Sequence, residues 1–190
     1  MIKNFVKIVA LATAMTLLFG CGGGGGGGGS AMSLPTSYWT LDSHTFVDGG
    51  YSTASTNLIG GRPVTVAIVS TATLAGGDKN NGDYSGSLIS FTFGGTAAGI
   101  YQVTADKNAL SSTYGLTTLP IIVESMVGIA VTTGATQYRG STGQVKVTID
   151  GAGKYHFESI GPITAAKTLD VKGGVVGAPA SMALNIYDAY

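Results

Sequence analysis

The sequence predicts an all-β domain, an antiparallel β-sandwich of about eight or nine strands. Three observations support this fold class. Beyond residue 33 the chain is rich in Thr, Val, Ile and Tyr, which favour strands, and no stretch has the spacing of an amphipathic helix. Several segments alternate apolar and polar residues, and glycine-rich turns separate these segments. A small closed β-barrel is the alternative architecture, because it produces the same pattern.

The first predicted strands are short, and a long one follows. Residues 38–41 form a strand, and residues 44–46 continue it or pair with it. Residues 62–74 alternate over a longer stretch. Val64, Val66 and Ile68 are therefore expected on the buried face of that strand, with the threonines on the other.

A hairpin is expected next. Residues 88–93 carry Phe91 and Phe93 on one face, and residues 100–105 carry Tyr101. Gly94-Gly95 begins a tight loop between the two segments, so they are expected to pair with each other. Residues 106–119 are then expected to form a loop.

Strands also dominate the second half of the chain. The clearest alternation lies in residues 144–150, where Val145, Val147 and Ile149 point inward. Lys167 falls on the apolar face of its strand, which predicts a sheet edge or a bulge there. The strands predicted in this half cover residues 121–132, 144–150, 154–159, 163–171 and 182–187.

The polar loop of residues 75–86 does not fit a metal site. A calcium loop of the EF-hand type requires Gly at its sixth position and Glu at its twelfth. Counted from Asp78, these positions hold Asp83 and Ile89. The loop is therefore interpreted as a solvated turn, and no cofactor or metal is expected.

The two histidines give no recognisable catalytic motif. A Ser-His-Asp set would need His44 or His156 near a carboxylate such as Asp42 and near a serine, but the sequence has no Gly-x-Ser-x-Gly elbow. We interpret His156 as a surface histidine beside Glu158. No catalytic residue is predicted.

Tyr38 and Trp39 are the candidate ligand contacts. Trp39 is the only tryptophan, and aromatic side chains are enriched at binding surfaces, where they stack on sugars or on partner chains. The alternative, which we favour for Trp39, is a core residue that closes one end of the sandwich.

The N-terminal segment has the pattern of an export signal. Lys3 and Lys7 precede an apolar run over residues 8–19, which is too short to span a bilayer as a helix. Leu18-Phe19-Gly20-Cys21 follows, and this motif resembles the lipobox of bacterial lipoproteins. Phe19 is bulkier than the usual residue at its position. The resemblance implies a signal peptide over residues 1–20, cleavage before Cys21 and lipidation of Cys21.

The resemblance also implies a location. Gly22, rather than Asp, follows the cysteine, which in Gram-negative lipoproteins implies export to the outer membrane. Residues 21–33 then form a lipidated, glycine-rich tether, because polyglycine behaves as a flexible coil. Residues 34–190 form the single all-β domain. Its strand pattern vaguely resembles small all-β domains of uncharacterised bacterial lipoproteins, which implies no particular activity.

Composition narrows the function classes. Without Lys3 and Lys7 the chain has eight basic and ten acidic residues, so no nucleic-acid partner is expected. We expect a non-enzymatic binding or structural module of the envelope, held to the membrane through Cys21, whose ligand and whose protein or glycan partner the sequence does not identify. The alternatives are an envelope hydrolase of glycans or esters, and a small barrel that binds an apolar ligand.

Overall fold

The computed structural model describes residues 37–49, 51–71, 87–112, 119–130, 134–170 and 177–190. The predicted signal peptide, the tether with Cys21, and the loop at Asp78 lie outside the described residues. The described strands belong to one compact unit, Pro35–Tyr190. They are β1 Tyr38–Leu41, β2 His44–Val47, β3 Tyr51–Ile59, β4 Arg62–Ser70, β5 Leu88–Gly94, β6 Gly99–Val103, β7 Leu119–Ala130, β8 Gly134–Thr142, β9 Gln144–Ile149, β10 Tyr155–Ser159, β11 Ile163–Asp170 and β12 Ser181–Tyr187.

The all-β prediction is confirmed, with more strands than expected. The described residues contain twelve strands and one helical turn, α2 Ala109–Ser112, which lies in the segment predicted as a loop. The two strands absent from the prediction are β3 and β8.

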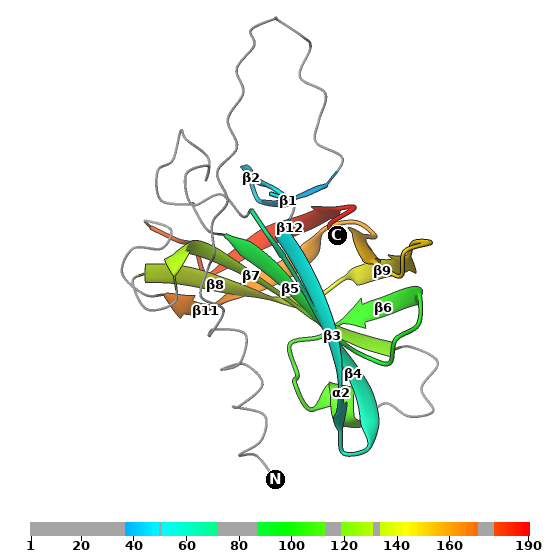
Figure 1. The fold of residues 1–190 in the computed structure, drawn as a ribbon. Helices are drawn as coiled ribbons and strands as arrows, with labels where there is room; N and C mark the ends of the chain where they lie inside the picture. Colours follow the sequence, from blue (N-terminus) through cyan, green and yellow to red (C-terminus); the bar gives the residue numbers. More distant parts are fainter. Residues whose placement is uncertain (1–36, 50, 72–86, 113–118, 131–133, 171–176) are drawn as a thin grey trace, which may run out of the picture. The chain divides into compact units, whose positions relative to one another are not determined.

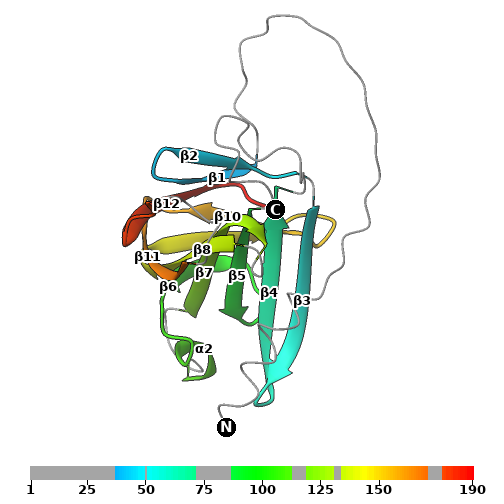
Figure 2. The ribbon, with the colours of Figure 1, turned by 90° about the vertical axis from the view of Figure 1, so that its left-hand side faces the viewer.

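One curled sheet contains all of these strands (Figure 1). Its long path runs β3-β4-β5-β7-β8-β11-β12-β1-β2, and every neighbouring pair on this path is antiparallel. Figure 2 shows β3 and β4 as a long ribbon beside β5, with β1 and β2 next to β12. A second path leaves β7 at its first residues, where β6 pairs with it in parallel and continues to β9 and β10.

A short bridge joins the end of this second path to the first. Phe157 in β10 and Ala189, just after β12, exchange two backbone hydrogen bonds of 2.9 Å. The neighbouring Ser159 hydroxyl accepts a hydrogen bond from Ile186 N–H at 2.9 Å. Pairing therefore runs in a ring from β7 through β8, β11, β12, β10, β9 and β6 back to β7. The sheet is therefore curled and partly closed, which is consistent with either architecture that the sequence left open.

Aromatic rings fill the core where the two paths face each other. Phe91 in β5 stacks on Phe157 in β10 with ring centroids 3.8 Å apart, and Phe93 packs edge-on against Tyr101 in β6 at 5.1 Å. All four side chains are buried. Burying such rings contributes about 1.5–3 kcal/mol each, so this cluster holds the two paths together.

Three sequence predictions are corrected by the strand pairing. Residues 88–93 and 100–105 do not form a hairpin: β5 pairs with β4 and β7, whereas β6 pairs with β7 and β9. The buried face of β4 carries Thr65, Ala67 and Val69, so the predicted face was inverted, although Val64 is also buried. Ile149 is 39% exposed, because it lies at the end of β9.

Lys167 marks a bulge, as predicted, but not an edge. β11 has β8 on one side and β12 on the other, and its register against β8 shifts between Lys167 and Leu169. The Lys167 ammonium donates to Asp170 Oδ2 at 2.8 Å and to the Ala178 carbonyl at 2.9 Å. The charged group at the bulge thus has polar partners at the end of β11 and in the segment before β12.

Within the described ranges, no helix has the length and apolar character needed to cross a membrane.

Candidate binding site

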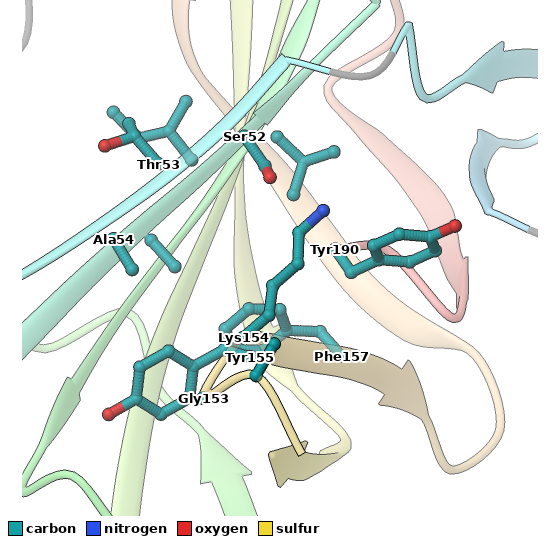
Figure 3. Close-up of a pocket in the computed structure, with 12 residues that line it drawn as sticks. Ser52, Thr53, Ala54, Gly153, Lys154, Tyr155, Phe157 and Tyr190 are labelled. Atoms are coloured by element: carbon teal, nitrogen blue, oxygen red, sulfur yellow. The ribbon is translucent and has the colours of Figure 1, made fainter. Parts of the chain in front are cut away.

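A pocket of about 240 Å³ lies between the β3–β4 hairpin and the turn that joins β9 to β10 (Figure 3). Its residues come from four places in the chain: β3, β4, the turn with the start of β10, and the segment after β12. The lining residues are Ser52, Thr53, Ala54, Ala67, Ile68, Val69, Ala152, Gly153, Lys154, Tyr155, Phe157 and Tyr190.

The hairpin forms one wall of the pocket. Ser52 pairs with Val69, and Ala54 pairs with Ala67. Because directly opposed residues of an antiparallel pair project to the same face, Ser52 and Ala54 lie on the face that carries the buried Val69 and Ala67. The wall is therefore apolar near the core and becomes polar toward the edge strand β3.

Asp150 holds the opposite wall in place. Its Oδ1 accepts hydrogen bonds from the backbone N–H groups of Ala152 and Lys154, both at 2.8 Å. Gly153 closes the turn with a φ of 80°, a conformation that favours glycine. The backbone hydrogen bond from Lys154 is the largest cause that lowers the pKa of the Asp150 carboxyl, followed by those from Ala152 and from His156. The anionic form of Asp150 thus stabilises the turn that presents Lys154.

Lys154 and Tyr190 form the outer part of the pocket. The Lys154 ammonium lies 4.3 Å from the centroid of the Tyr190 ring, a cation–π contact. Figure 3 shows the Lys154 chain extending from the turn toward Ser52, with the Tyr190 ring beside it. Among the described lining residues, Lys154 is the one with a charged side chain.

His156 supports Tyr190 from behind. The two rings stack with centroids 4.6 Å apart and an interplanar angle of 25°. The imidazole Nδ1 lies 2.9 Å from Asp188 Oδ1, and Nε2 lies 3.5 Å from Asp150 Oδ2. The sequence predicted a surface histidine at this position, and the side chain is 20% exposed. Its carboxylate neighbours come from the β9–β10 turn and from the segment after β12.

The sequence-derived candidates lie elsewhere. Trp39 is fully buried and stacks on Phe46 at 5.6 Å, so its ring is part of the core. Tyr38 is partly buried and stacks on Tyr187 at 4.4 Å. Neither residue lines the pocket. His44 lies in β2 opposite Leu41, and Cys21 is outside the described residues.

The pocket residues themselves were not predicted. Lys154 and Tyr190 line the pocket and Asp150 holds the turn beside it, but each is an isolated polar or aromatic residue in the sequence. The bridge between Phe157 and Ala189 brings Tyr190 to this turn. The Asp150-Gly151-Ala152-Gly153 turn was the one available signal, because Asp before glycines often caps a turn through its side chain.

The arrangement of His156 differs from that of a catalytic triad. In a triad, one imidazole nitrogen faces the carboxylate and the other faces the nucleophile. Here both nitrogens face carboxylates. In the part of the chain that the structure describes, no three His, Cys, Asp or Glu side chains are grouped so as to hold a metal ion.

Comparison of the chain with protein-family models, with curated proteins and with solved structures found no match.

Proposed function

We propose that this protein is a lipid-anchored, non-enzymatic binding module of the bacterial cell envelope. The motif Leu18-Phe19-Gly20-Cys21 after a short apolar run carries the proposal. Lipid on Cys21 would hold the domain at the outer membrane, and the pocket between β3 and the β9–β10 turn would receive the ligand.

The chemistry of the N-terminal segment supports the anchor. Each buried methylene of a lipid chain contributes about 0.8 kcal/mol, so several acyl chains on one cysteine hold a protein firmly. Eight glycines follow Cys21, and such a coil reaches roughly 15–20 Å. A tether of this length would let the domain stand clear of the lipid headgroups.

The geometry of the pocket supports binding rather than hydrolysis. With Asp188 and Asp150 at its two nitrogens, His156 is placed to hold the Tyr190 ring rather than to deprotonate a serine. The interior is filled by packed aromatic rings such as Phe91 and Phe157, which argues against an enclosed site for an apolar ligand.

The anchor is tested by membrane fractionation of cells that express the Cys21→Ser variant. We expect the wild type in the membrane fraction and the variant in a soluble or uncleaved pool. Ser30→Ala, a change in the tether, is the matched control and should fractionate as wild type. A mass spectrum of wild-type protein with a free thiol on Cys21 would refute the anchor.

The proposed location at the outer membrane is tested with a second variant. Gly22→Asp should move the protein from the outer to the inner membrane on a density gradient, because the residue after the cysteine is the sorting signal that the resemblance implies. If wild type and Gly22→Asp sediment together, the outer-membrane assignment fails and the lipid anchor itself is unaffected.

A further inference from the structure

We propose that β3 binds an extended peptide as an added strand, and that Lys154 selects an acidic side chain of that peptide. This inference rests on the proposed binding function and names its ligand class. Three observations carry it: the open edge of β3, the absence of protective residues along it, and the charge of the pocket beside it.

The first observation is the direction of the main-chain groups of β3. Thr71 N–H donates toward β5, to Ser87 O, whereas Ser70 O faces the other side and accepts from Gly49 N–H. Main-chain groups alternate along a strand, so the even-numbered residues of β4 face β3. Their partners are the odd-numbered residues Thr53 and Ser55.

The even-numbered residues of β3 therefore point their N–H and C=O groups outward. These residues are Ser52, Ala54, Thr56 and Leu58. Within the described ranges, β3 pairs with β4 alone, and residues 54–58 are exposed. A second strand would find a row of donors and acceptors here, as in other cases of strand addition.

The second observation is the composition of this edge. Exposed edge strands are usually short, or they contain Lys, Pro or a bulge, and these features prevent pairing with other chains. β3 is nine residues long and contains no charged residue and no proline, and its register against β4 is continuous. The edge has the features of a strand that accepts a partner.

The third observation is the pocket next to the outward groups. Ser52 and Ala54 line it, so alternate side chains of an added strand would point into it. The Lys154 ammonium has only the Tyr190 ring as its partner among the described residues. An acidic side chain on the added strand would meet this ammonium. The exposed Ala54 and the partly buried Tyr155, which also line the pocket, would contact its aliphatic neighbours.

The test uses the full-length protein in detergent and a fluorescently labelled peptide, Thr-Val-Thr-Asp-Thr-Val-Thr. In an extended conformation this peptide places Val, Asp and Val on one face. We expect saturable binding by fluorescence anisotropy, about threefold tighter than that of the same peptide with Asn in place of Asp. Lys154→Gln should abolish this preference. A peptide that does not bind overturns the inference.

Ala54→Pro tests the edge itself. It removes an outward N–H without removing a hydrogen bond to β4, so the hairpin should persist while peptide affinity falls about tenfold. Ala54→Ser keeps the N–H and should bind within about twofold of wild type. Unchanged binding by a folded Ala54→Pro variant contradicts strand addition.

N-methylated peptides test the same edge without altering the protein. One peptide carries methyl groups on its odd-numbered backbone nitrogens and the other on its even-numbered ones. Only one of the two sets of N–H groups faces β3. Methylation of that set should abolish binding, and methylation of the other set should leave binding intact. Equal binding by both peptides contradicts the proposal.

Two outcomes separate this inference from the function on which it rests. If ultracentrifugation shows a wild-type dimer that Ala54→Pro dissociates, a second copy of the chain occupies the edge and the peptide proposal fails. If the peptide does not bind but an envelope glycan fragment shifts the Tyr155 and Tyr190 resonances, the binding function stands and the peptide proposal fails.

Discussion

Asp188 Oδ1 lies 2.9 Å from Nδ1 of His156, across 32 residues of sequence. The contact fastens the segment after β12 to β10, next to the two backbone hydrogen bonds between Phe157 and Ala189. Asp188 has a φ of 49°, a left-handed conformation that Asp and Asn tolerate better than most residues. Asp188 thus stabilises the closure of the strand ring and also positions His156, whose ring stacks on Tyr190 in the pocket wall.

Replacing Asp188 should loosen this closure. Asp188→Ala removes the acceptor and the tolerance of a positive φ, and we expect a loss of about 1–2 kcal/mol in the free energy of unfolding. Asp188→Asn keeps both an acceptor and the tolerance, so its loss should be smaller. Urea denaturation measures both. Glu158→Ala, at an exposed pair with Lys146, is the control; equal losses for Asp188→Ala and Glu158→Ala would contradict this role.

The turn at Asp150 predicts a pH dependence. The pKa of its carboxyl is lowered in the folded protein, so its stabilising effect is present above the pKa of the unfolded chain, about 3.9, and is lost as the pH falls through the lower folded value. The difference in unfolding free energy between wild type and Asp150→Ala should therefore be larger at neutral pH than below about pH 3. A difference that stays constant from pH 7 to the acid limit would rule out this linkage.

Truncation of the stacked pair Phe91 and Phe157 should be costly, because both rings are fully buried. Phe157→Ala removes a ring at 3.8 Å from Phe91 and leaves a cavity where the two paths of the sheet meet. We expect a loss of about 3–5 kcal/mol by chemical denaturation. Ile160→Ala, at a side chain that is 46% exposed, should change stability by less than about 0.5 kcal/mol. Losses of similar size at both positions would contradict a stabilising role for this stack.

Gly140 is required where β8 passes close to β6. A Cβ there would lie 2.7 Å from Val103 Cγ1 and 3.1 Å from Ile163 Cγ2. Gly140→Ala should therefore destabilise by about 1–3 kcal/mol, and the added Val103→Ala change should recover part of the loss. Gly151→Ala is the control, because a Cβ there meets nothing within 4 Å. Strict additivity of the two changes would contradict the proposed clash.

The same glycine explains why β8 was not recognised in the sequence. Its inward positions are Thr136, Tyr138 and Gly140, so only one of the three carries a large side chain, and at Gly140 the close approach of Val103 leaves no room for a Cβ. The apolar alternation that identified β9 is therefore missing. β3 was not predicted for a related reason. Residues 54–58 are exposed, so this segment has no buried face and shows no alternation of apolar and polar residues.

Strands with one buried face were predictable, and their neighbours were not. Ile89, Phe91 and Phe93 follow the expected inward pattern, but β5 and β6 are separated by β7 in the sheet. Adjacent segments often pair, and the parallel contact of β6 with β7 departs from this tendency. The candidate site depends entirely on such pairings, since Asp150, His156 and Asp188 meet only after β10 reaches the end of β12.

The pairing of Tyr38 with Tyr187 has a kinetic consequence. The β1–β2 hairpin is translated first among the described strands, yet β12, its partner in the sheet, is translated last. The β1–β2 hairpin cannot pair with β12 until nearly the whole domain has been synthesised, so little tertiary structure at this end of the domain can form on a growing chain. Chains dominated by such distant partners fold on the order of milliseconds to seconds, so this end of the domain is expected to be among the last parts to become ordered.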